Sequence, residues 1–150
     1  MRPRTLLRVG LALLAAMQAY VGWALLAPRA FYDGFPLAGH AWVAMLPPYN
    51  EHLVRDVGAY SLALTVPVIA AAITGDRRSV RVALLALAAF AVPHAIFHAG
   101  HLAGFPPADA VAQTAGTVVQ LLLVAGLFAL TWHLPAPAQA DPARDLSGLG

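Results

Sequence analysis

The apolar residues of this chain fall into four long stretches, each bounded by proline, glycine or charged residues. Each stretch is long enough to cross roughly 30 Å of hydrocarbon as a helix rising about 1.5 Å per residue. A helix satisfies its own backbone hydrogen bonds, which lipid cannot do, so helices are the expected form. The pattern predicts an all-α integral membrane four-helix bundle over residues 1–134, with spans at about 6–26, 52–73, 80–102 and 109–132.

The first stretch has an alternative interpretation as a secretory signal peptide. Arg2, Arg4 and Arg8 would then form its positively charged leading segment. The apolar part is longer than the core of such a peptide, and three further spans follow it. We therefore expect the stretch to be retained as the first span.

The arginines predict how the bundle is oriented. They gather in two groups, Arg2, Arg4 and Arg8 before the first span and Arg77, Arg78 and Arg81 between the second and third. The connection at residues 104–107 has no basic residue, and the loop 28–50 has only Arg29. Cytoplasmic loops carry an excess of basic residues, so both termini are expected in the cytoplasm and the chain in the inner (plasma) membrane. Short connections make successive helices antiparallel neighbours.

Two segments lie outside the predicted spans. The outer loop 28–50 is rich in aromatic residues, which favour the interface between lipid and water. A short interfacial helix is expected there, around residues 38–45. The tail 135–150 is rich in proline, alanine and polar residues and is predicted to be a disordered cytoplasmic segment.

Composition narrows the possible functions. The chain is 60% hydrophobic and 11% charged, against about 45–50% and 25% for a typical soluble domain. All nine basic residues are arginines, and most of them lie at positions that a membrane topology explains, so we expect no nucleic-acid partner and the lipid bilayer as surroundings. The absence of cysteine excludes thiol and disulfide chemistry. No complete catalytic motif is present, so an enzyme is not expected.

Ionisable residues inside spans are costly and are candidates for function. Here they concentrate in two segments, Asn50–Asp56 at the start of the second span and Pro93–His101 at the end of the third. On regular helices His52 and Asp56 share one face within about 40°, and His94, His98 and His101 share an arc of about 60°.

This arrangement suggests a site for a divalent transition metal. Imidazole and carboxylate groups are the ligands of such ions. The first candidate set is His98 and His101 with His52 and Asp56, and the second is His94 and His98 with Asp56. Arg55 argues against a metal if it points into the site, because it repels cations.

Two other functional interpretations of these residues remain open. The polar residues of the second and third spans are expected to form a pocket in the outer half of the bundle. This pocket is a candidate binding site for an organic ligand, such as a quinone, a haem or a lipid headgroup, and the chain would then be a redox-associated module. A proton relay is another possibility. The candidate ligand-binding residues are Arg55, Gln113, Gln120 and Gln18.

The alternative is a structural network in a non-catalytic scaffold or a subunit of a membrane-protein partner. Glu51 and Arg55 stand in the favourable order for an i, i+4 pair, and Asn50 is a good helix cap. The same polar residues would then lock the second span to the third. His40 and His133 are expected to be isolated interfacial or tail histidines.

The residue strings Phe31–Pro36, Pro48–Ala59 and Pro93–His94 with His98 and His101 resemble those of a group of small uncharacterised four-helix membrane proteins of actinobacteria. The resemblance spans about residues 31–120. It implies the fold and the membrane location and no particular activity. The architecture is also similar to the DoxX-like superfamily of four-helix membrane proteins, some tied to quinone or redox systems. That similarity is one of size and topology.

Overall fold

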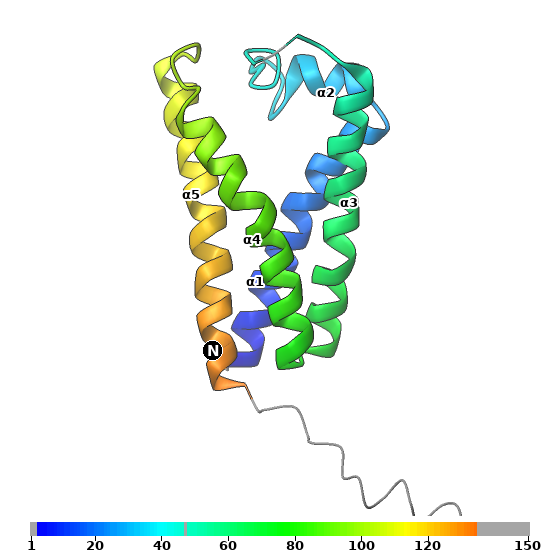
Figure 1. Cartoon of the computed structure of the whole chain (residues 1–150), viewed down its shortest axis with the longest axis vertical. Helices are drawn as coiled ribbons and strands as arrows, with labels where there is room; N and C mark the ends of the chain where they lie inside the picture. The colour runs from blue at the N-terminus through cyan, green and yellow to red at the C-terminus, as the bar shows by residue number, and fades with distance from the viewer. Residues whose placement is uncertain (1–2, 47, 135–150) are drawn as a thin grey trace, which may run out of the picture.

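A computed structural model describes residues 3–46 and 48–134, and all regular structure in this part of the chain is helical (Figure 1). The long helices are α1 (Pro3–Val21), α3 (Glu51–Thr74), α4 (Arg77–Ala99) and α5 (Pro107–Leu130). The short ones are η1 (Gly22–Leu25), α2 (Pro28–Gly34) and η2 (Thr131–His133). The predicted tail 135–150 lies outside the described residues.

The expectation of four long apolar helices is confirmed. Four helical segments are long and apolar enough to cross a membrane: Pro3–Leu25, Glu51–Thr74, Arg77–Ala99 and Pro107–His133. Sequence features explain where they begin and end. Asn50 caps α3, its side chain accepting a hydrogen bond from the Leu53 amide at 3.2 Å. Gly75, with φ of 65°, ends α3 in the left-handed conformation that glycine tolerates best.

The long loop differs from its prediction. Residues 38–45 form turns, and the helix of this segment is α2, earlier in the chain. Pro28 occupies the first turn of α2, where its missing N–H costs nothing. Arg29 donates to Asp33 one turn later at 2.6 Å. This hydrogen bond raises the pKa of Arg29 above its ordinary value.

The bundle is built from two helix pairs. α1 with η1 packs along α3, and α4 packs along α5. Figure 1 shows the pairs close together at the end that carries the N-terminus and diverging toward the end covered by α2. The first we call the arginine end, because Arg4, Arg8, Arg77 and Arg78 lie there, and the second the capped end.

The arginine half holds the main apolar core. Its buried residues come from all four long helices and from Leu134: Leu7, Leu11, Leu14, Ala15, Leu64, Val68, Ala71, Val80, Ala83, Leu84, Leu87, Val124, Leu127 and Leu134. A second, smaller core at the capped end consists of Ala24, Phe31 and Val54 with partly buried neighbours.

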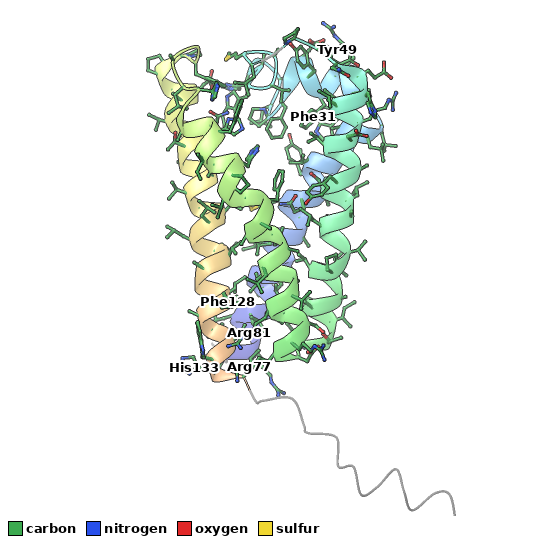
Figure 2. The ribbon with its side chains drawn as sticks, in the orientation of Figure 1. Phe31, Tyr49, Arg77, Arg81, Phe128 and His133 are labelled. Atoms are coloured by element: carbon green, nitrogen blue, oxygen red, sulfur yellow. The ribbon has the colours of Figure 1, made fainter. Side chains whose placement is uncertain are left out.

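Arg81 fastens α4 to the end of α5 (Figure 2). Its Nε donates to the Thr131 hydroxyl at 2.8 Å. Its guanidinium lies over the rings of Phe128, at 5.5 Å, and Trp132, at 5.3 Å. The arginine half is therefore closed by side-chain bonding as well as by packing.

The outer surfaces of the four helices are strongly apolar. No more than 39% of the most hydrophobic window of any candidate span is buried within the chain. Leu26, Val66, Ile73 and Val111 are each at least 67% exposed. A soluble monomer rarely exposes contiguous apolar surface on this scale, whereas lipid covers it without cost.

Candidate functional site

A cavity of about 560 Å³ occupies the capped half, between the diverging helix pairs. Its wall is mostly apolar and aromatic, with contributions from α1, the segment 31–50, α3, α4 and α5. Besides Tyr20, Tyr32 and Trp42, the polar side chains in the wall are Gln18, Asn50, Ser61, His94, His98, Gln113, Thr117 and Gln120. A mostly apolar cavity with a few polar groups is typical of a site for a small organic molecule.

Residues 28–46 close the capped end and are called the lid here. Phe31 and Phe35 pack at 4.7 Å between ring centroids, and Trp42 meets the Phe35 ring edge-on at 6.3 Å. The hydroxyl of Tyr20 on α1 donates to the carbonyl of Pro36. Figure 2 places Phe31 beneath the cap, on the side facing the bundle. The aromatic residues of the loop thus form the roof of the cavity.

The lid is also fastened to α5. Asp109, buried in the first turn of α5, pairs with His40 Nδ1 at 2.7 Å and accepts a hydrogen bond from Trp42 Nε1 at 3.0 Å. The expectation that His40 is isolated was therefore wrong. The contact joins residues about 70 positions apart, which helical periodicity does not indicate. The sequence offered one indication, the position of Asp109 in the first turn of a span, where the helix dipole stabilises a carboxylate.

Two buried polar atoms at the cavity have no hydrogen-bond partner among the described residues, Oε1 of Gln113 and Nδ1 of His98. Gln113 is only 6% exposed, and its side chain lies close enough to interact with the His98 ring. Buried polar groups are normally paired, because leaving one unpaired costs about 1–3 kcal/mol. Both atoms are shielded from the cavity space, so a ligand would bond to them after the Gln113 or His98 side chain turns toward the cavity.

His94 and His98 belong to a series of rings on the cavity side of α4. Phe90 stacks on His94 at 5.0 Å, and His94 meets His98 edge-on at 4.3 Å. Tyr60 of α3 packs on Phe90 at 5.6 Å, so the series begins where α3 and α4 touch. Of the four candidate histidines, His94 and His98 line the cavity. The predicted Gln18, Gln113 and Gln120 line the same cavity.

The predicted metal set is not brought together. His52 and Asp56 approach each other at 3.5 Å, but their side chains are 82% and 60% exposed and face away from the cavity. His101 lies after the end of α4, stacked on Phe97 at 4.0 Å. Within residues 3–46 and 48–134, no three His, Asp or Glu side chains are placed to hold a metal ion. On α3 the cavity-lining residues include Leu53 and Val57. His52 and Asp56 each precede one of these by one residue, so they lie about 100° around the helix, on another face.

Arg55 is also absent from the cavity wall. It pairs with Glu51, Nε to Oε1 at 2.9 Å, and its Nη1 donates to the carbonyl of Leu25 at 2.5 Å. The expected Glu51–Arg55 pair is therefore confirmed, and Arg55 as a ligand-binding residue is not supported. A cation at the end of η1 satisfies a backbone carbonyl that the helix leaves free.

The cavity wall contains no Arg, Lys, Asp or Glu among the described residues. A charged ligand would therefore lose its hydration without an opposite charge to replace it. The wall suits an uncharged molecule with an apolar body and a hydrogen-bonding group. Comparisons with protein-family models, curated proteins and solved structures found no match to this chain.

Proposed function

We propose that the chain is a multi-pass membrane protein that binds an uncharged lipophilic molecule of the quinol or quinone type in the capped cavity. The observation that carries the proposal is an apolar cavity of about 560 Å³ with two unpaired polar atoms, Gln113 Oε1 and His98 Nδ1. The ligand's apolar body would contact the aromatic wall. Its polar group would bond to Gln113 and His98, whose side chains carry the only described atoms among the cavity-lining residues that are both buried and unbonded, once these side chains turn toward the cavity.

The two free atoms specify the ligand's polar group. Oε1 of Gln113 accepts a hydrogen bond, so it pairs with an O–H or N–H of the ligand. Neutral imidazole presents either a donor or an acceptor at Nδ1, depending on its tautomer. A single hydroxyl donates to Gln113 and accepts from a protonated His98 Nδ1. A carbonyl is accommodated when the Gln113 amide turns to present its NH₂ group.

The bilayer is part of the proposal. The apolar outer faces of the four spans support membrane insertion, and the grouping of arginines supports a cytoplasmic arginine end in the plasma membrane. The lid then lies on the outer side. Because the chain has no cysteine, single-cysteine variants report this directly. Ala38→Cys should react with an impermeant maleimide in intact cells, and Thr74→Cys only after lysis. The reverse pattern would overturn the orientation.

The ligand is tested by analysis of the purified protein. The full chain is extracted from native membranes in mild detergent, and bound lipids are identified by mass spectrometry. We expect an uncharged hydroxyl- or carbonyl-bearing lipid in stoichiometric amount, lost from Gln113→Leu. His52→Ala is the matched control, because His52 lies outside the cavity wall, and it should retain the lipid.

Identical trace lipids in wild type and Gln113→Leu would contradict the proposal. That result would favour the scaffold alternative, in which the cavity has no resident ligand. Stoichiometric transition metal in wild type, lost from His98→Ala, would instead favour a metal site that this arrangement of side chains does not assemble.

A further inference from the structure

The side of the cavity between α3 and α4 is less closed than its roof. α3 and α4 diverge toward the capped end in Figure 1. Leu53 and Val57 on α3 and His94 and Phe97 on α4 all line the cavity, yet all four are exposed. Leu53 is 59% exposed, and Val57 and Phe97 are each 43% exposed. These four residues are called the α3/α4 seam, because they line the cavity and are also exposed on the outer surface of the bundle.

The seam has a defined lower limit. The rings of Tyr60 and Phe90 bridge α3 and α4 at 5.6 Å, and below this contact both helices contribute to the buried core. Above it, the lid is held on one side by Tyr20 and on the other by Asp109. Hydrogen bonds therefore hold the lid to α1 and to α5, whereas no hydrogen bond among the described residues joins the two sides of the seam.

The polar groups follow a gradient from the seam inward. His94 is exposed at the seam, His98 is half-buried behind it, and Gln113 is almost fully buried on α5. The seam edges, by contrast, are apolar at Leu53, Val57 and Phe97. A molecule with one polar end would satisfy both regions when its polar group lies deepest and its hydrocarbon lies in the seam.

We infer that the ligand is an uncharged single-chain lipid with a hydroxylated ring, which reaches the cavity from the bilayer through the α3/α4 seam. Its ring lies against the side chains of His98 and Gln113, and its chain remains in the seam beside Leu53, Val57 and Phe97. The inference rests on the proposed function and adds the route and the chain. The ring is favoured by the aromatic wall, since aromatic pairs gain about 0.5–1.5 kcal/mol beyond their buried area.

The absence of charged side chains among the described wall residues selects against phospholipids. A phosphate-bearing headgroup would enter the cavity without an Arg or Lys to meet it, because Arg55 is engaged with Glu51 and Leu25. Desolvating an unpaired anion is far more costly than desolvating a hydroxyl. The bilayer itself therefore does not supply the ligand from its bulk phospholipid.

The test compares two probes that share a headgroup, 4-dodecylphenol and 4-ethylphenol, in their radiolabelled forms. Each is measured for binding to the full chain in phosphatidylcholine nanodiscs, with retention by empty nanodiscs subtracted. We expect the dodecyl probe to bind at least about tenfold more tightly, a difference set by chain contacts in the seam. Val57→Trp should abolish this difference, because the indole fills the seam.

Val66→Trp is the matched control on the same helix. Val66 is 67% exposed and does not line the cavity, so both probes should bind this variant as they bind wild type. Phe97→Ala widens the seam without adding bulk and should speed exchange of the dodecyl probe. This second variant keeps the inference testable if Val57→Trp does not fold.

The outcomes separate the inference from the proposed function. Equal binding of the two probes, with no effect of Val57→Trp or Phe97→Ala, would overturn the seam route and leave cavity binding intact. Binding of neither probe to wild type would overturn the hydroxylated-ring ligand. Loss of a co-purified lipid in Gln113→Leu would in that case still support the proposed function with another headgroup.

Discussion

The two halves of the bundle use similar helices to opposite effect. In the arginine half, residues from all four helices interlock into one core, and Leu11, Leu84 and Leu87 are fully buried. In the capped half the helix pairs diverge around a cavity of about 560 Å³, and the lid supplies the closure that packing does not. The difference shows that tight packing at one end of a four-helix bundle is compatible with a cavity between the same helices at the other end.

The largest loss of stability is expected from Gly58→Ala, which tests whether helices in the hollow half are still in close contact. A Cβ at Gly58 would overlap the backbone nitrogen of Leu25 and lie 3.0 Å from the Ala24 carbonyl carbon. Backbone cannot move aside as a side chain does, so Gly58→Ala should destabilise the protein by about 3 kcal/mol. Gly126→Ala, where a Cβ meets nothing within 4 Å, is the matched control. Thermal unfolding in detergent measures both, and equal stabilities would show that η1 and α3 are not in close contact.

The next effect compares the two halves directly. Leu84→Ala removes a fully buried side chain from the packed core, while Leu53→Ala removes a 59% exposed one from the cavity wall. Lipid is as apolar as leucine, so the loss comes mainly from packing contacts, and we expect about 2 kcal/mol for Leu84→Ala. Leu53→Ala should change stability by no more than about 0.5 kcal/mol. Similar losses in the two variants would contradict the division into a packed and a hollow half.

A smaller and more local effect is expected at the lid. Asp109→Asn keeps one acceptor oxygen but removes the negative charge of the carboxylate to which His40 and Trp42 are bonded. We expect it to lower the free energy of unfolding of the lid by about 1 kcal/mol. Hydrogen exchange should increase in residues 37–46 while the amides around Leu84 stay protected. Asp33→Asn is the control, since Asp33 bonds only within α2 among the described residues. Uniform loss of protection across the chain would mean that the lid and the core unfold together.

The smallest effect concerns pH at the arginine end. Asp76 caps α4 by accepting from Ser79, which lowers the pKa of its carboxyl from 3.8 to about 2. A pKa lowered by folding adds stability that is complete above the ordinary value and is lost as pH falls toward 2. Wild type should therefore lose slightly more stability than Asp76→Ala between about pH 4 and 2. Parallel pH profiles would show that this carboxylate does not cap α4.

Much of this architecture follows from local sequence. Apolar length predicts the four helices, and local chemistry places Asn50 as the cap of α3 and Glu51 beside Arg55. These contacts join residues within one helical turn, where spacing alone fixes which side chains meet. The same reasoning correctly placed Gln18, His98 and Gln113 in one interior, because polar groups in a bundle avoid lipid.

Only the tertiary structure decided which of those residues form the site. Helical spacing predicted a set of His52 and Asp56 with His98 and His101. The packing of α3 turns Leu53 and Val57 toward the cavity and leaves His52 and Asp56 exposed on another face. The bond from His40 to Asp109 joins a loop to a distant helix, and no local rule predicts it. Helix crossing depends on the summed packing of both helix faces, so sequence determined the spans and their polar stripes, and packing determined the cavity between them.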